Sequence, residues 1–160
     1  MNPSTRQHDI SQINEYLFIS AWPRGEHNDQ IRALDIRLIL SMHWQRPSKT
    51  LGHTPVRLLW LPTLDSPLTP LPLSVLKRGV EAALPVIEDG WKVLVHCKYG
   101  IHRSVAMACC VLIGRGSSAD EAMELVAQCR AAADPYADYV QSRIRKFERV
   151  WDQLHPTTAA

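Results

Sequence analysis

A cysteine and an arginine with five residues between them follow a short apolar run, and their types and spacing suit chemistry on a phosphate group. Cys97 begins this segment and Arg103 ends it, and only His96 separates Cys97 from the apolar residues 93–95. A thiolate can attack phosphorus, and a planar guanidinium can hold two oxygens of a dianion. A strand that turns through a glycine into a helix also aims backbone N–H groups at one point. The segment therefore predicts an anion site with a cysteine as its nucleophile.

The residues around this pair complete the predicted site. Ser104 places a hydroxyl at the start of the next helix, where it can also serve as the N-cap, and His96 precedes the nucleophile. We expect His102 to face solvent or substrate. The predicted phosphate-binding loop consists of Lys98, Tyr99, Gly100, Ile101, His102 and Arg103.

The order His96, Cys97, five residues, Arg103 and Ser104 resembles the phosphate loop of the cysteine-dependent protein tyrosine phosphatases. The chain length is similar to that of their compact dual-specificity members, and the resemblance extends over residues 13–151. It implies that Cys97 attacks phosphorus while Arg103 and the loop amides hold the phosphoryl group. It further implies that Ser104 eases departure of the thiolate and that His96 supports the loop from beneath.

The loop contains no carboxylic acid, so a proton for the leaving group must come from elsewhere in the chain. Asp65 lies in a Pro-rich segment after the apolar run 56–61, and the resemblance implies a general acid at about this distance before Cys97. A simple turn or capping role is the alternative for Asp65. Asp89 is a rival, but Asp89 and Gly90 are typical of a turn.

The remaining cysteines and the histidines do not indicate a metal site. We expect Cys109, Cys110 and Cys129 to be small buried hydrophobic residues. His96, Cys97 and His102 could ligate a metal, but no zinc-type spacing of cysteine and histidine recurs in the chain. We predict no metal and no cofactor.

Four cysteines without framework spacing favour a reducing compartment, and we expect a cytoplasmic protein.

The elements that must hold this loop alternate between strands and helices. Apolar runs predict strands at 16–19, 36–40, 56–61 and 93–95, and helical periodicity predicts helices at 76–87 and 119–129. Residues 105–113 are apolar all round, which predicts a buried central helix that carries Arg103. Ser118 and Glu121 match a capping box, and Asp134 with Pro135 predicts the start of a last helix. We assign only structural roles to the last two helices.

This alternation predicts an α/β fold with a central, mainly parallel sheet of four to five strands flanked by helices, as in dual-specificity phosphatases. Catalytic loops are expected at the carboxyl edge of such a sheet. We divide the chain into an N-terminal extension (1–12), a single phosphatase catalytic domain (13–153) and a flexible tail (154–160).

Composition agrees with one globular domain and excludes several classes of protein. The chain has 160 residues, is 46% hydrophobic and carries a formal net charge of +2. This charge is too small to indicate a nucleic acid or an anionic membrane as partner. No apolar run reaches the length of a membrane span or forms a signal segment. We expect a monomer.

We predict a phosphatase of phosphotyrosine and phosphoserine or phosphothreonine in a phosphorylated protein or peptide. A phosphoinositide or a phosphorylated nucleotide or RNA is the alternative substrate, because Lys98 directly follows the nucleophile, as in relatives that act on inositides. Ile101 weakens that interpretation, since those relatives often carry a second basic residue there. The same loop could also belong to a phosphate-binding module without turnover or to a sulfur transferase.

The loop after Ser41 could add to the pocket. Trp44 either lines the pocket wall or covers core, and Arg46 and Lys49 either add positive charge at the mouth or are solvated.

Overall fold

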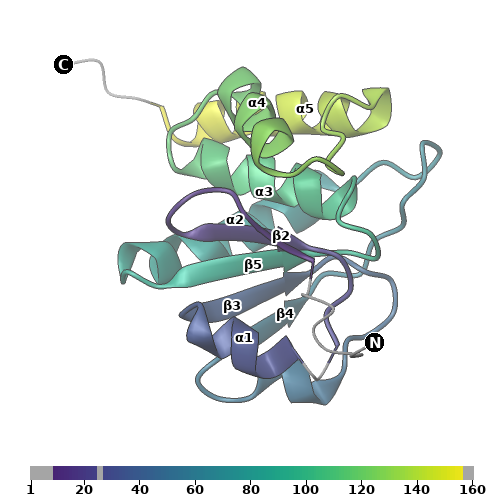
Figure 1. The fold of residues 1–160 in the computed structure, drawn as a ribbon. Helices are drawn as coiled ribbons and strands as arrows, with labels where there is room; N and C mark the ends of the chain where they lie inside the picture. The colour runs from purple at the N-terminus through teal and green to yellow at the C-terminus, as the bar shows by residue number, and fades with distance from the viewer. Residues whose placement is uncertain (1–8, 25–26, 157–160) are drawn as a thin grey trace.

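The computed structural model describes residues 9–24 and 27–156. Five strands form one sheet in the order β1-β2-β5-β3-β4 (Figure 1). The strands are β1 (Ile10–Gln12), β2 (Leu17–Ser20), β3 (Ile36–Ser41), β4 (Arg57–Trp60) and β5 (Lys92–His96). The helices are α1 (Asn28–Ala33), a 3₁₀ helix (Lys49–Gly52), α2 (Leu73–Glu88), α3 (Arg103–Gly114), α4 (Ala119–Cys129) and α5 (Asp138–Leu154).

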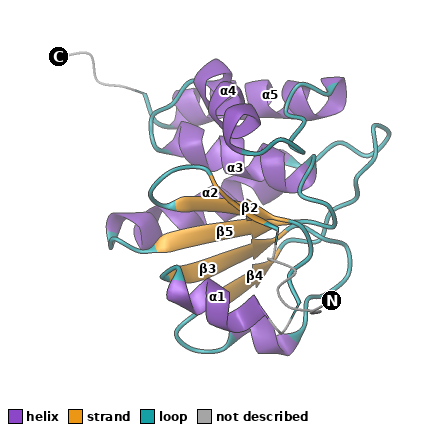
Figure 2. Cartoon of the chain, viewed as in Figure 1, coloured by secondary structure: helices purple, strands orange, loops and turns teal. Residues whose placement is uncertain are grey.

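The predicted α/β fold with a mainly parallel sheet is confirmed. β5 lies between β2 and β3 and is parallel to both, β4 is parallel to β3, and only β1 runs antiparallel, against β2. Helix α1 covers one face of the sheet, and the other four α-helices lie on the opposite face (Figure 2). Because β5 is the central strand, the loop that follows it emerges in the middle of the carboxyl edge.

Alternating side chains of β5 serve two cores. Val93 and Val95 belong to the large core shared with α2–α5, whereas Leu94 belongs to a smaller core under α1. All three are fully buried, which stabilises the strand by about 1.5–3 kcal/mol for each large side chain. Helix α3 is buried from Arg103 to Ile113, so it gives the end of the loop a rigid anchor.

The sheet begins earlier than the sequence indicates. Ile10 pairs with Ser20, so the edge strand β1 lies within the segment 1–12 that we treat as an extension. A three-residue strand is too short to leave a periodic pattern, which explains why it is not predicted. Residues 1–8 of that extension lie outside the described residues, as do residues 157–160 of the predicted tail.

The last two helices show one agreement and two differences. The predicted capping box of α4 is present, because Ser118 and Glu121 bond each other's backbone N–H. Helix α5 starts at Asp138, not at Asp134, because the N–H of Asp134 bonds the carbonyl of Ile101 and its side chain accepts from Ala137. Cys109 and Cys110 are buried as predicted, but Cys129 is exposed.

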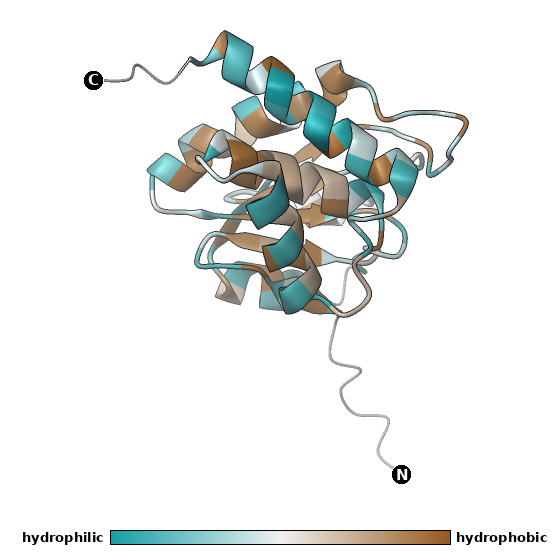
Figure 3. Ribbon diagram, turned by 90° about the horizontal axis from the view of Figure 1, so that it is seen from above, coloured by the Kyte–Doolittle hydropathy of each residue, from teal (hydrophilic) through white to brown (hydrophobic). Residues whose placement is uncertain are grey.

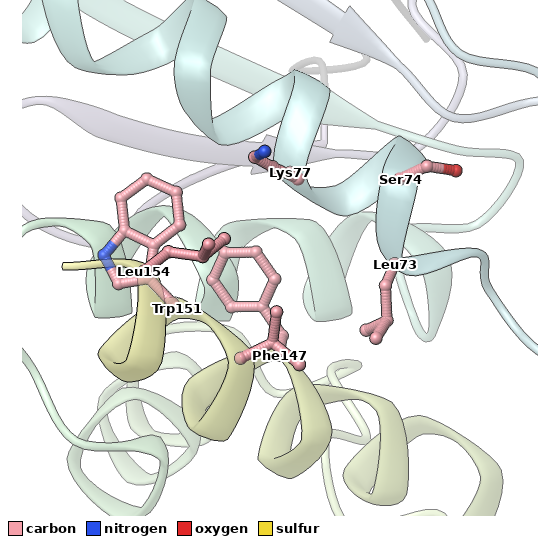
Figure 4. Close-up of a pocket in the computed structure, with 7 residues that line it drawn as sticks. Leu73, Ser74, Lys77, Phe147, Trp151 and Leu154 are labelled. Carbon is pink, nitrogen blue, oxygen red and sulfur yellow. The ribbon is translucent and has the colours of Figure 1, made fainter.

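Helix α5 lies on the outside of the helical layer. Seen from above, it shows mostly hydrophilic residues (Figure 3), while Ile144 and Phe147 on its other face are buried. Near its end a small apolar hollow lies between α5 and α2, with Leu73, Phe147 and Trp151 among its lining (Figure 4). Within the described ranges, no helix is both long and apolar enough to cross a bilayer.

Candidate active site

The predicted site residues meet at the carboxyl edge of the parallel strands. Cys97 follows β5, and the loop 97–103, which we call the phosphate loop, connects it to α3. Met42 follows β3 directly, and Asp65 lies in the segment 61–72 between β4 and α2, which we call the acid loop. Asp89 lies in the turn before β5, at the opposite edge, so the structure excludes it as a rival acid.

Five consecutive carbonyl groups of the phosphate loop, those of residues 98–102, are bonded to donors outside the loop. The guanidinium group of Arg130 donates to the carbonyls of residues 99 and 100. Backbone N–H groups donate to the other three: Trp22 to residue 98, Asp134 to residue 101 and Ala106 to residue 102. Loop peptides are trans, so the N–H that shares a peptide plane with each carbonyl points the opposite way, into the loop. The N–H of Gly100 accordingly donates to Cys97 Sγ at 3.3 Å. The result is a concave set of donors suited to an anion.

Arg130 holds the loop from behind, a role that the sequence did not predict. Its side chain is only 2% exposed, and Nε donates to the carbonyl of Gly100 at 2.7 Å. Nη1 and Nη2 contact the two carboxylate oxygens of Asp9 at 3.0 and 2.7 Å. Asp9 lies in the segment that we predicted to be an extension, so this segment helps to fix the phosphate loop.

The same packing explains the glycine of the loop. Gly100 has a φ of +68°, which favours glycine. A Cβ there would lie 2.5 Å from Arg130 Nη2 and 2.9 Å from the carbonyl oxygen of Ser20. The loop can therefore close onto its support only with glycine at this position.

Cys97 lies at the base of the loop and is 3% exposed. Its Sγ is 3.2 Å from the hydroxyl of Ser104, which, together with the N–H of Gly100, can donate to a thiolate. His96 is fully buried beneath the loop, and its Nδ1 lies 3.3 Å from the carbonyl of Cys97. Two of the predicted residues thus surround the sulfur, and a third braces the backbone that carries it.

Arg103 is held by two carbonyl groups, one directly after β3 and one in the acid loop. Its side chain is nearly buried, and Nη1 donates to the carbonyls of Thr63 at 2.8 Å and of Met42 at 3.4 Å. Its buried Nε has no hydrogen-bond partner among the described residues. A buried donor without a partner is costly, and a bound phosphate oxygen would satisfy it.

A neighbouring histidine adds no positive charge to the site. Burial, and then the nearby charge of Arg103, lower the pKa of His43 below its usual value of 6.5. His43 is therefore neutral at neutral pH. Its ring packs edge-on against Trp22, with centroids 4.6 Å apart.

Asp65 is brought to the end of the phosphate loop by two partners. Its Oδ2 lies 3.1 Å from Nδ1 of His102, and its Oδ1 accepts a hydrogen bond of 2.8 Å from the hydroxyl of Tyr139. The ring of His102 is half-buried against these two groups, with 23% of its side chain exposed, and the expectation that it faces solvent or substrate stays a prediction. Tyr139 belongs to a helix that we had assigned a purely structural role.

The remaining loop side chains form the rim. Lys98 and Tyr99 are exposed, and Ile101 is half-buried. Trp44 is 61% exposed and borders a shallow hollow shared with Leu64 and with Thr63, whose carbonyl holds Arg103. Trp44 therefore lines a wall beside the site and does not cover core.

Arg46 and Lys49, the arginine and the lysine of the segment between β3 and β4, are both exposed.

The potential metal ligands among the described residues do not gather at one place. Across the described part of the chain, histidine, cysteine, aspartate and glutamate side chains form no group of three or more that could hold a metal ion.

Comparison with known proteins decides the family. Residues 17–149 match the family described as "Dual specificity phosphatase, catalytic domain". The chain is 33% identical to mouse dual specificity phosphatase 28 over 143 residues, which is 88% of this chain and 84% of the relative. The chain belongs to the dual specificity phosphatase family. It is thus a cysteine-dependent phosphatase, as the phosphate loop indicated.

Solved structures agree with a dual specificity phosphatase fold. A mouse putative dual specificity phosphatase superposes with a TM-score of 0.84 at 24% identity, covering 96% of this chain and 95% of the other. The Y102H variant of human DUSP28 gives a TM-score of 0.81 at 24% identity over 91% and 98%. PTPMT1 in complex with PI(5)P gives 0.78 at 24% over 91% and 97%. At this identity the three structures support the fold alone.

Proposed function

We propose that this dual specificity phosphatase hydrolyses phosphate monoesters through a phosphate bound covalently to Cys97. The thiolate attacks phosphorus, the S–P bond forms, and the bond from phosphorus to the leaving oxygen breaks. Arg103 and the loop N–H groups hold the non-bridging oxygens throughout the transfer. Asp65 gives its proton to the leaving oxygen, so the product departs as a neutral alcohol or phenol.

The second step returns the enzyme to its starting state. Water attacks phosphorus and passes a proton to the Asp65 carboxylate, and the S–P bond breaks. The electron pair stays on the sulfur of Cys97, where the Ser104 hydroxyl and the Gly100 N–H stabilise the thiolate. Inorganic phosphate then leaves the loop. No step in this reaction uses a metal or a cofactor.

One observation carries this proposal. Five consecutive carbonyls of the loop are bonded outside it, so the N–H groups of the same trans peptides point away from those partners, and the N–H of Gly100 contacts Cys97 Sγ at 3.3 Å. A structural cysteine would not need such an arrangement, whereas a trigonal bipyramidal phosphoryl group has three oxygens that require donors.

We propose phosphorylated side chains of proteins as the substrates, both phosphotyrosine and phosphoserine or phosphothreonine. The rim supports this choice, because exposed aromatic and apolar residues such as Trp44, Leu64 and Tyr99 lie around the loop and can pack against a peptide. Lys98 supports the alternative of a phosphoinositide or phosphorylated nucleotide. Rates on phosphopeptides, phosphoinositides and nucleotides at matched concentrations distinguish these classes, and we expect phosphopeptides to give the highest kcat/KM.

We further propose that the protein acts in the cytoplasm as a monomer, with Cys97 kept reduced, and that it does not bind nucleic acid. The four cysteines are all free, which suits a reducing compartment. We retain residues 13–153 as the catalytic domain, extended by β1 and Asp9 at its start.

Replacing Asp65 by asparagine should lower kcat/KM for a phosphoserine peptide by about 10²–10⁴-fold, since the alkoxide then leaves without a proton. The effect should be much smaller for p-nitrophenyl phosphate, whose leaving group is stable as an anion. Steady-state rates on the two substrates measure the difference. Asp89→Asn is the matched control and should behave like the native protein, and equal rates for Asp65→Asn and native protein on both substrates would exclude Asp65 as the acid.

A further inference from the structure

Three polar side chains from three separate elements meet beside the phosphate loop. Asp65 comes from the acid loop, His102 from the position before α3, and Tyr139 from the first turn of α5, which lies beyond α3 in the helical layer (Figure 1). The hydroxyl of Tyr139 lies 2.8 Å from Asp65 Oδ1 and 3.0 Å from His102 Nδ1, and His102 Nδ1 lies 3.1 Å from Asp65 Oδ2. Each side chain thus contacts the other two.

Tyr139 can donate to Asp65 at any pH below the pKa of its hydroxyl. Burial, together with the hydrogen bond and the charge of Asp65, raises the pKa of Tyr139 to about 12, whereas the charge of Arg103 opposes this shift. A phenol keeps its proton below its pKa, so the hydroxyl remains a donor. Its oxygen can at the same time accept from Nδ1 of His102.

His102 can hold the carboxyl group in both of its protonation states. An imidazole nitrogen without a proton accepts a hydrogen bond, and one with a proton donates. Nδ1 can therefore accept from the protonated carboxyl group of Asp65 and donate to the ionised carboxylate. The other ring nitrogen, Nε2, lies 3.8 Å from Asp134 Oδ2. Asp134 is itself tied to the phosphate loop through the carbonyl of Ile101. The ring therefore has a carboxylate on each side, Asp65 at hydrogen-bond distance and Asp134 at ion-pair distance.

Asp65 needs such support because of its position. It lies in a loop, its side chain is about one-third exposed, and the acid loop is anchored on either side of it through Thr63 and Leu71. Those anchors fix the backbone and leave the carboxyl group free to rotate. A reacting group displaced by about 1 Å can lose about 10²-fold in rate.

We propose that Tyr139 is a positioning residue that, together with His102, orients the Asp65 carboxyl group toward the leaving oxygen. This inference rests on the proposed function of Asp65 as general acid. The hydroxyl of Tyr139 makes its hydrogen bonds to Asp65 and His102 alone among the described residues, while its ring packs against the core. Removing the oxygen therefore removes the positioning and leaves the packing.

Tyr139→Phe tests this with a readout that a purely structural role would not move. We expect kcat/KM, which reports all steps up to loss of the leaving group, to fall about 10-fold for a phosphoserine peptide and by less than about 2-fold for p-nitrophenyl phosphate. Tyr136→Phe, an exposed tyrosine on the preceding loop, is the matched control and should match the native protein on both substrates.

The outcomes separate the two proposals. If Asp65→Asn shows the dependence on leaving group and Tyr139→Phe does not, the positioning role is wrong and the acid role stands. If neither variant shows it, the proposed role of Asp65 fails. An equal loss on both substrates in Tyr139→Phe would indicate general damage to the site and would also overturn the positioning role.

Discussion

Cys97→Ser should abolish turnover, with a fall in kcat on the order of 10⁵–10⁶-fold, the size expected when a covalent nucleophile is removed. The hydroxyl of serine is a poor nucleophile in a loop that stabilises a thiolate through Ser104 and the N–H of Gly100. The phosphate-binding donors are untouched by this change. The variant should therefore still bind a phosphopeptide, which isothermal titration or fluorescence anisotropy would measure.

Cys129→Ser provides the matched control for that variant. Cys129 is the exposed member of the four free cysteines, and its replacement should leave both turnover and binding at the native level. Measurable turnover of a phosphopeptide by Cys97→Ser would contradict the nucleophile assignment. Binding without turnover in the native protein would instead favour a phosphate-binding module.

Arg103→Lys should lower kcat/KM by about 10³-fold although it keeps the positive charge, because an ammonium group cannot span two phosphoryl oxygens as a guanidinium does. In the native side chain, Nη1 of Arg103 donates to the carbonyl of Thr63, and Nε has no hydrogen-bond partner among the described residues. The same variant should bind inorganic vanadate more weakly, which competition against turnover of p-nitrophenyl phosphate measures.

The control for this change lies at the far end of the same helix. Arg115 follows α3 at its C-terminus, and Arg115→Lys should leave kcat/KM and vanadate affinity at their native values. Native-like kcat/KM in Arg103→Lys would show that a point charge suffices and that the planar fork is not required. Melting temperatures of both variants, measured beside the rates, separate lost chemistry from lost folding.

Local sequence pattern was sufficient to predict four of the five strands and the place of the phosphate loop between β5 and α3. The strand β5, the glycine turn and the buried helix α3 are contiguous in sequence, so their apolar runs and the spacing of Cys97 and Arg103 show together. Helix α4 was likewise visible through the capping box of Ser118 and Glu121. Each of these features depends on neighbours within a few residues.

The supports of the site could not be predicted in this way. Arg130 and Tyr139 lie thirty or more residues from the groups they hold, and their value depends on where α4 and α5 pack. Asp9 lies near the other end of the chain from Arg130, at a sequence separation of 121. The one available signal was a charged residue at a helix end with no local partner, as Arg130 is after α4, and such residues are usually solvated.

The proposed covalent intermediate on Cys97 should be open to trapping during turnover. Rapid acid quench of the native protein with an aryl phosphate, followed by digestion and mass spectrometry, should find one phosphoryl group on the peptide that contains Cys97. The adduct should accumulate further in Ser104→Ala, whose second step lacks the hydroxyl beside Sγ. Turnover at the native rate with no phosphorylated Cys97, or with the phosphoryl group on another residue, would contradict the proposed mechanism.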